Sequence, residues 1–209
     1  MGDQKLPFDL AERYDILYGF GNDSNNHVYA GYDYATRQKV VIACFNKKYF
    51  HVTRKAVYDL LNLRHLHLVK IRGIYVRSPS IIIIQDYIYG QLLSDLMSSD
   101  QMPNRQTVEK WIQEIHSALI YLHNHEPYSF GHGDIKPENV MIDCFGMARI
   151  IDFSSFVELN NQAGFRDLKA TRRYAADAAL RFGIYDAQCD WHSFKLLCQV
   201  MRKKIKPGD

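Results

Sequence analysis

Hydrophobic and polar residues in the first part of the chain alternate in short runs, as they do in half-buried β-strands. The runs are rich in β-branched and aromatic residues and lie at residues 14–18, 28–32, 40–45, 69–76 and 80–85. Between the third and the fourth run, apolar side chains recur at helical spacing over residues 53–63. The pattern therefore predicts an antiparallel sheet of five strands that one helix interrupts.

The second half of the chain has mainly helical periodicity. Residues 92–97 and 107–123 carry apolar side chains at helical spacing among good helix formers. A last helix is predicted from Asp190, as its N-cap, to about Met201. Within this half, a small hairpin is predicted from two β-rich pieces and the turn-like sequence between them, at residues 140–142, 148–151 and 143–146.

Composition and charge narrow the class of protein. A chain of 209 residues that is 47% hydrophobic can bury a substantial core, in one domain or two small lobes. Its 26 basic and 23 acidic residues are scattered and form no basic face, so nucleic acid is not an expected partner. The four cysteines lie in apolar segments without metal-ligand spacing, and there is no signal peptide or membrane-spanning run. We expect a cytoplasmic protein without a membrane partner.

Four segments, in order along the chain, resemble motifs of one protein family. Residues 132–139, H-G-D-I-K-P-E-N, resemble the catalytic loop of protein kinases, H-R-D-x-K-P-x-N. Residues 151–154, I-D-F-S, resemble the metal-binding D-F-G motif, and its aspartate follows the catalytic-loop aspartate by 18 residues. Downstream, residues 173–180 resemble the Y-x-A-P-E segment, and residues 190–194 resemble the start of the buried helix after it. The sequence is identified as kinase-like over nearly its whole length.

The resemblance implies an α+β, two-lobed protein-kinase-like fold with a small antiparallel β lobe and a truncated helical large lobe. It places the small lobe at residues 8–85, the hinge at 86–90 and the truncated large lobe at 91–209, with nucleotide bound in the cleft between the lobes. Truncation should expose apolar surface on the last helix, near Phe194, Leu197 and Val200. The alternative is that Trp191, Phe194 and Leu197 form the core of the lobe.

The resemblance also assigns roles to single residues. Asp134 would be the catalytic base and Lys136 a phosphate contact, while Asn139 and Asp152 would be Mg²⁺ ligands. A degenerate nucleotide cleft would be lined by Gly21, Val28, Ala43, Gln85, Asp86 and Tyr87. Gln85 would occupy the gatekeeper position of this cleft. The catalytic and metal residues would be vestigial, and the alternative is that buried Asp and Asn side chains persist because they hold loop backbone by hydrogen bonds.

The glycine-rich loop of the family is incomplete here. Anchoring G-x-G-x-x-G-x-V on Val28 puts Gly21 at the first glycine, but Asp23 and Asn26 at the other two. Glycine lets backbone amides approach phosphate closely, whereas a carboxylate repels it. Gly133 also replaces the catalytic-loop arginine. In the Y-x-A-P-E-like segment, proline and glutamate are replaced by Asp177 and Ala178.

Both halves of the family's lysine–glutamate ion pair are replaced by alanine. The strand lysine is expected at Ala43, and the helix glutamate at Ala56. The loss of the lysine alone should cost roughly 3–4 kcal/mol of transition-state stabilisation, by analogy with deleting one preorganised donor. Substitution by a neighbouring cation, Lys39, Lys47 or Lys48, is the alternative.

These losses predict a catalytically inactive pseudokinase domain that acts as a protein-interaction scaffold, with no cofactor expected and only weak binding of ATP and Mg²⁺. Its expected partners are other proteins, such as flanking domains, kinases or scaffold proteins. A weak or unorthodox ATP-dependent Ser/Thr protein kinase, or an ATP-binding sensor without phosphotransfer, is the alternative. The sequence further resembles the degenerate kinase domains of the obscurin family of giant muscle proteins, which implies a sarcomeric cytoskeleton setting; a small microbial or viral kinase-like effector is the competing origin.

Overall fold

The computed structural model describes residues 7–23, 26–99, 101–159, 171, 173–176 and 185–205. The chain divides into two compact units, Met1–Lys47 with Lys70–Tyr87 and Lys48–Val69 with Ile88–Asp209. The prediction assigned residues 48–69 to the small lobe together with the sheet. In the structure this segment belongs to the second unit. The lobe boundaries and the hinge stay predictions.

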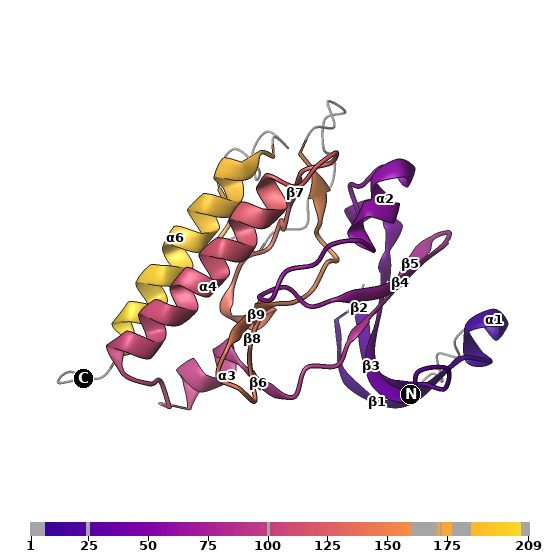
Figure 1. Ribbon diagram of the computed structural model, residues 1–209, viewed down its shortest axis with the longest axis horizontal. Helices are drawn as coiled ribbons and strands as arrows, with labels where there is room; N and C mark the ends of the chain where they lie inside the picture. The colour runs from indigo at the N-terminus through magenta and orange to yellow at the C-terminus, as the bar shows by residue number, and fades with distance from the viewer. Residues whose placement is uncertain are drawn as a thin grey trace. The chain divides into compact units, whose positions relative to one another are not determined.

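The first unit is a five-stranded antiparallel sheet with the strand order β1-β2-β3-β5-β4 (Figure 1). Its elements are the short helix α1 (Phe8–Ala11) and the strands β1 (Tyr14–Asp23), β2 (Asn26–Asp33), β3 (Gln38–Asn46), β4 (Ile71–Arg77) and β5 (Ser80–Asp86). All five predicted strands are confirmed. One face of the sheet carries an apolar cluster made by Leu10, Tyr14, Val40, Ile42, Ile82 and Ile84.

Strand β3 has different residues on its two faces because side chains alternate along a strand. Val40 and Ile42 face the apolar cluster. Ala43, by its position in the alternation, faces the other way and is 6% exposed. Its register partners are Val28 on β2 and Ile83 on β5. Ala43 therefore lies near the centre of the sheet, and β-branched neighbours flank it on both sides.

The second unit is mainly helical and contains two small sheets (Figure 1). Its helices are α2 (Arg54–Leu60), α3 (Leu93–Ser98), α4 (Arg105–His123) and α6 (Ala187–Lys203), with a 3-10 turn η2 (Pro137–Asn139), and a further turn η1 (Lys47–Tyr49) joins it to the first unit. Its strands are β6 (Gly90–Leu92), β7 (Phe130–Gly131), β8 (Val140–Asp143), β9 (Ala148–Ile150) and β10 (Val157–Glu158). Helices α4 and α6 lie side by side.

The helices of the second unit begin at recognisable caps. The Thr53 hydroxyl accepts a hydrogen bond from Ala56 N at 3.4 Å, and the Asn104 side chain accepts one from Thr107 N at 3.0 Å. The predicted helices are confirmed with shifts of a few residues at their ends. Of the helices in the part of the chain that the structure describes, none is long and apolar enough to cross a lipid bilayer.

The last helix differs from its prediction in two respects. It begins at Ala187, and its N-cap is Asp186, whose carboxylate accepts from Gln188 N at 2.9 Å, so the prediction of Asp190 as N-cap was wrong. The prediction of exposed apolar surface was wrong at Phe194 and Leu197, because both side chains are buried. The alternative, that they belong to the core, holds at these two positions. The α+β class, with a small antiparallel sheet and a helical part, is confirmed.

The sheet of the first unit can be tested at its inner strand β5. Ile83 on β5 is fully buried between β3 and β4, so Ile83→Ala should lower the free energy of unfolding by about 2–5 kcal/mol. Val76→Ala on β4 is the control, because Val76 is 43% exposed and its truncation should cost no more than about 0.5 kcal/mol. Urea denaturation measures both, and equal losses would contradict the assignment of β5 to the core.

Candidate active site

The catalytic-loop segment is anchored through its backbone to a buried carboxylate on α6. Asp190 is fully buried, and its Oδ2 accepts from His132 N at 2.8 Å while its Oδ1 accepts from Gly133 N at 3.1 Å. His123 Nε2 lies 2.9 Å from Oδ2, and the Tyr185 hydroxyl donates to Oδ1. A carboxylate inside α6 thus fixes the two residues that precede Asp134.

The donors around Asp190 also set its charge state. Burial alone would raise the pKa of Asp190, but the hydrogen bond and the electrostatic interaction with His123, together with His132 and Tyr185, hold that pKa below its usual value. Tyr185 is buried as well, and both its burial and the neighbouring Asp190 carboxylate raise the pKa of its hydroxyl well above the usual range. Asp190 is therefore a charged acceptor and Tyr185 a neutral donor.

Asp134 lies at the centre of a polar cluster in the second unit. Lys136 Nζ is 2.6 Å from Asp134 Oδ2 and donates to the Thr171 hydroxyl at 2.9 Å. Thr171 N donates to Asp134 Oδ1 at 3.1 Å. Asn139 Nδ2 donates to Asp134 O at 2.7 Å and to Oδ2 at 3.3 Å. The structure thus brings together three of the predicted residues, Asp134, Lys136 and Asn139, around one carboxylate.

His132 links this cluster to the segment that carries Asp152. Its Nε2 lies 3.0 Å from Ile151 O and therefore carries the proton, which leaves Nδ1 to accept from Asp134 N at 3.3 Å. The imidazole ring contacts Phe156 edge-on at 5.5 Å, and Phe156 packs against Phe153 with ring centroids 4.5 Å apart. His132, Phe153 and Phe156 are all buried, so the two motif segments share one aromatic core.

The two predicted metal ligands flank the open end of the β8–β9 hairpin. Asn139 directly precedes β8, and Asp152 follows β9 by two residues. Ile151 N donates to Asn139 O at 2.9 Å, which joins the two ends. Asp152 has φ 66° and accepts from Ser154 N at 2.9 Å. A positive φ is uncommon for a residue with a side chain and costs about 1–3 kcal/mol, and such residues cluster at functional sites.

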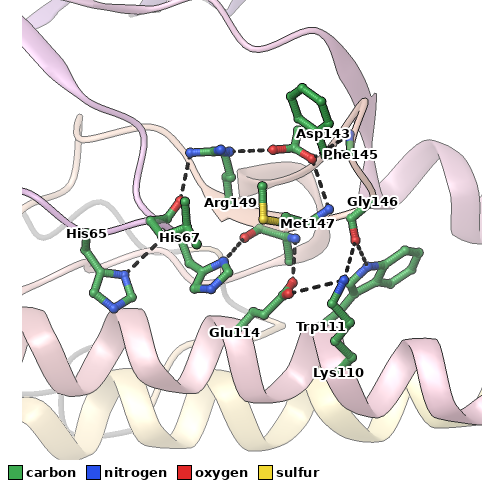
Figure 2. Close-up of polar contacts among 12 residues, drawn as sticks. His65, His67, Lys110, Trp111, Glu114, Asp143, Phe145, Gly146, Met147 and Arg149 are labelled. Carbon is green, nitrogen blue, oxygen red and sulfur yellow. Dashed lines mark hydrogen bonds and ion pairs between the residues drawn. The ribbon is translucent and has the colours of Figure 1, made fainter.

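The predicted hairpin is confirmed, and Figure 2 shows the polar network around its turn. Asp143 Oδ1 accepts from Phe145 N and Met147 N, both at 3.0 Å, while Arg149 Nε donates to Oδ2 at 2.8 Å. Burial would raise the pKa of Asp143, but these hydrogen bonds hold it below its usual value. Gly146 completes the turn with φ 73°.

The six predicted nucleotide-cleft residues all belong to the first unit. Gly21 pairs with Val28, and Val28 pairs with Ala43 on the next strand. Gln85 is 4% exposed. Asp86 ends β5 and forms an ion pair with Arg72. Tyr87 follows it, and the hydroxyl groups of Tyr18 and Tyr87 lie 3.1 Å apart. What these residues bind stays a prediction.

The lysines considered as replacements lie away from Ala43 along the chain. Lys39 has the same strand parity as Ala43, but four residues of strand separate them, which is about 13 Å. Lys39 Nζ lies over the Tyr87 ring, 5.5 Å from its centroid. Lys47 and Lys48 follow β3 in the turn η1. Ala56, the second alanine of the predicted pair, is fully buried on α2.

Three residues of the site were not found from the sequence. Thr171 contacts both Lys136 and Asp134, and its one sequence signal is its position shortly before the Y-x-A-P-E-like segment. His123 and Tyr185 reach Asp190 from α4 and from the residue before the N-cap of α6. The predicted replacements at residues 177 and 178 lie outside the described residues.

Comparison with known proteins agrees with the resemblance to protein kinases that the motifs indicate. The family model described as "Protein kinase domain" matches residues 14–207. The carbon catabolite-derepressing protein kinase of Saccharomyces cerevisiae is 31% identical over 204 residues, which cover 94% of this chain and 31% of that protein. The human serine/threonine-protein kinase MAK is 23% identical over 205 residues, which cover 94% of this chain and 32% of that protein. The chain thus spans about a third of the length of these relatives.

These names overturn one prediction. The prediction of a catalytically inactive protein-interaction scaffold was wrong, because the similar proteins are named as protein kinases. The physical reason is that the prediction weighed the lost cation of the first unit above the second-unit residues that are predicted to take part in proton transfer and metal binding. Of these residues, Lys136 and Asn139 contact Asp134 in a single cluster with Thr171. The alternative reading, a kinase, is the one that the relatives support.

The catalytic loop can be tested at Gly133. A Cβ there would lie 2.1 Å from Ser155 O, and the residue has φ 84°. Gly133→Ala should therefore add an overpacking cost of about 1–3 kcal/mol to the roughly 1–2 kcal/mol of a left-handed alanine. Gly146→Ala is matched, because Gly146 has φ 73° and nothing within 4 Å of its Cβ. Chemical denaturation compares the two, and equal losses would show that Gly133 is required for its φ alone.

The hairpin turn makes a pH-dependent prediction. The depressed pKa of Asp143 means that its carboxylate stabilises the fold above the unfolded-state pKa of about 3.9 and loses this contribution as pH falls through the folded-state value. Asp143→Asn should cost about 1.5–3 kcal/mol at pH 7, and its difference from wild type should shrink below about pH 4. Asp95→Asn, at an exposed position on α3, is the control. A difference that stays constant from pH 7 to pH 3 would refute the role of the charge.

Proposed function

Because the chain belongs to the protein kinase family, we propose that it is an ATP-dependent Ser/Thr protein kinase with an unorthodox nucleotide site. The observation that carries the proposal is the cluster in which Lys136 and Asn139 both reach Asp134 and Thr171 closes it from the other side. The Ser/Thr class is supported by the name of the MAK relative, a serine/threonine-protein kinase.

The proposed chemistry assigns one task to each side chain of this cluster. Asp134 accepts the proton of the substrate hydroxyl, for which its Oδ atoms are oriented by three donors. Lys136 lies at 2.6 Å from Asp134 and supplies a positive charge for the transferred phosphoryl group. Thr171 holds the ammonium group of Lys136 and the carboxylate of Asp134 in one arrangement. Positioning and charge stabilisation are the main protein contributions to phosphoryl transfer.

The residues present also fit Mg²⁺. Asn139 uses its amide nitrogen to donate to Asp134, so its carbonyl oxygen is the atom that a cation would meet. Asp152 adds a carboxylate, and oxygen donors are what Mg²⁺ prefers. The described residues contain no cluster of three or more His, Cys, Asp or Glu, and Mg²⁺ needs none, since it takes one or two protein side chains with substrate phosphates. Bound there, the ion would neutralise charge on the phosphates.

The nucleotide is proposed to bind to the first unit, at the face that carries Ala43. The missing cation should lower the rate by about 100- to 1000-fold relative to a kinase that has it. The partners, the cytoplasmic location and the obscurin-type muscle origin stay predictions, and the relatives reported above carry other names. The activity of a whole protein of their length is likewise a proposal.

A phosphotransfer assay with labelled MgATP and mixed Ser/Thr peptides tests the proposal. Asp134→Asn should lower the transfer rate by about 10²–10⁴-fold, because it removes the proton acceptor. Glu138→Gln is the matched control, since Glu138 lies exposed in η2 of the same loop and should leave the rate unchanged.

Two outcomes would contradict the proposed function. One is a wild-type chain that transfers no phosphate above background in Mg²⁺. The other is transfer that persists unchanged in Asp134→Asn. If wild type is stabilised by MgATP, by about 2.7 kcal/mol at a hundred times Kd, but transfers nothing, the chain is a nucleotide sensor instead.

A further inference from the structure

The distance between the two proposed metal ligands depends on the register of the β8–β9 hairpin. The register pairs Val140 with Ile150, Met141 with Arg149 and Ile142 with Ala148. Asn139 and Asp152 both lie just beyond the open end of this pairing, next to Val140 and Ile150. Any shift or pivot of β9 relative to β8 therefore moves Asp152 relative to Asn139. The contacts that hold β9 in place therefore also determine the separation of the two proposed metal ligands.

The outer edge of β9 is covered by the segment before β4. Ile150 N donates to His67 O at 2.9 Å, and Val69 N donates to Ile150 O at 3.0 Å. Arg149 donates from its guanidinium to Leu66 O at 2.7 Å. These contacts hold the end of β9 that leads to Asp152. They leave Ala148, at the start of the strand, to be held by other groups.

Ala148 is held by side chains on both of its backbone polar atoms. The two side chains, Glu114 and His67, are labelled in Figure 2. Glu114 Oε2 on α4 accepts from Ala148 N at 2.7 Å. His67 Nδ1 lies 2.9 Å from Ala148 O. Ala148 is fully buried, and the Glu114 side chain is 10% exposed with Lys110 Nζ 3.6 Å from its other oxygen. The Glu114 carboxylate on α4 thus accepts a hydrogen bond from a buried backbone N–H group of β9, and without it this N–H group would lack that acceptor.

A second attachment joins the hairpin to the same helix at its turn. Trp111 Nε1 donates to Gly146 O at 3.0 Å, and Lys110 Nζ donates to the same oxygen at 3.3 Å (Figure 2). Helix α4 is a rigid support, because it has 19 residues and a long buried face. The turn attachment and the contacts of Ile150 hold the two ends of the hairpin, and the hydrogen bond from Ala148 joins β9 itself to α4.

We propose that Glu114 is a positioning residue for the Mg²⁺ ligands Asn139 and Asp152, acting through Ala148 and β9. The inference rests on the proposed function, since it assumes that these two residues hold metal. Glu114 does not touch the metal or the substrate. Its carboxylate couples the hairpin to α4, so that the two ligand oxygens keep one separation.

The test compares metal affinity in three variants of the full chain. Mn²⁺ replaces Mg²⁺ as the probe, and electron paramagnetic resonance measures free Mn²⁺ in the presence of ADP. Glu114→Ala should weaken Mn²⁺ binding by about tenfold, the low end of what loss of an outer-shell partner costs. Glu114→Gln keeps an oxygen acceptor for Ala148 N and should restore most of the affinity. Glu109→Gln is the control on the same helix, because Glu109 pairs with Arg202 on α6.

A purely structural role predicts a different pattern. If Glu114→Ala lowers the Tm but binds Mn²⁺ as wild type does, the proposal is overturned. If Glu114→Ala does not fold, Glu114→Asp retracts the carboxylate by one methylene group and should weaken Mn²⁺ binding in the same direction; unchanged binding in that variant also overturns it. A wild-type chain that binds Mn²⁺ but transfers no phosphate contradicts the proposed function alone. A wild-type chain that binds no Mn²⁺ with ADP overturns both.

Discussion

The arrangement of the catalytic loop depends on one buried charge. Asp190 has no exposed surface, and a carboxylate in that position is tolerated only if hydrogen bonds satisfy it. Two of its donors are the backbone amides of His132 and Gly133, so the hydrogen bonds that satisfy the charge also fix the loop. Removing one partner of a buried charge typically costs about 3–5 kcal/mol. Asp190 on α6, with His123 on α4, therefore helps to fix the two residues that precede Asp134.

A second constraint, the β8–β9 hairpin, acts on the other side of the same site. Asp190 fixes the start of the catalytic loop, and the hairpin fixes Asn139 at its end together with Asp152. His132 joins the two constraints, because it bonds to Ile151 O beside the hairpin and to Asp134 N in the loop. The groups proposed for proton transfer and metal binding thus belong to one compact unit, and the residues proposed for nucleotide binding belong to the other.

Local pattern was sufficient for the strands, the hairpin and most helices, because alternation, turn residues and caps act over a few residues. It was insufficient at α6, where Asp186 and Asp190 both satisfy the capping rule and only the distant donors of the catalytic loop decide between them. Thr171 was missed for the same reason, since it meets Asp134 across 37 residues of sequence. Motif spacing found Asp134, Lys136 and Asn139, but could not show that they share one carboxylate.

The wrong functional prediction came from treating one lost cation as decisive. Ala43 and Ala56 do remove an ion pair, and both are small and buried. Enzymes, however, lower their barriers by about 8–23 kcal/mol in total, and one donor accounts for roughly 3–4 kcal/mol of that. A protein kinase typically turns over at about 1–100 s⁻¹, so a 100- to 1000-fold loss still leaves about 10⁻³–1 s⁻¹. Such a rate is far above background if Asp134, Asn139 and Asp152, which all belong to the second unit, act as proposed.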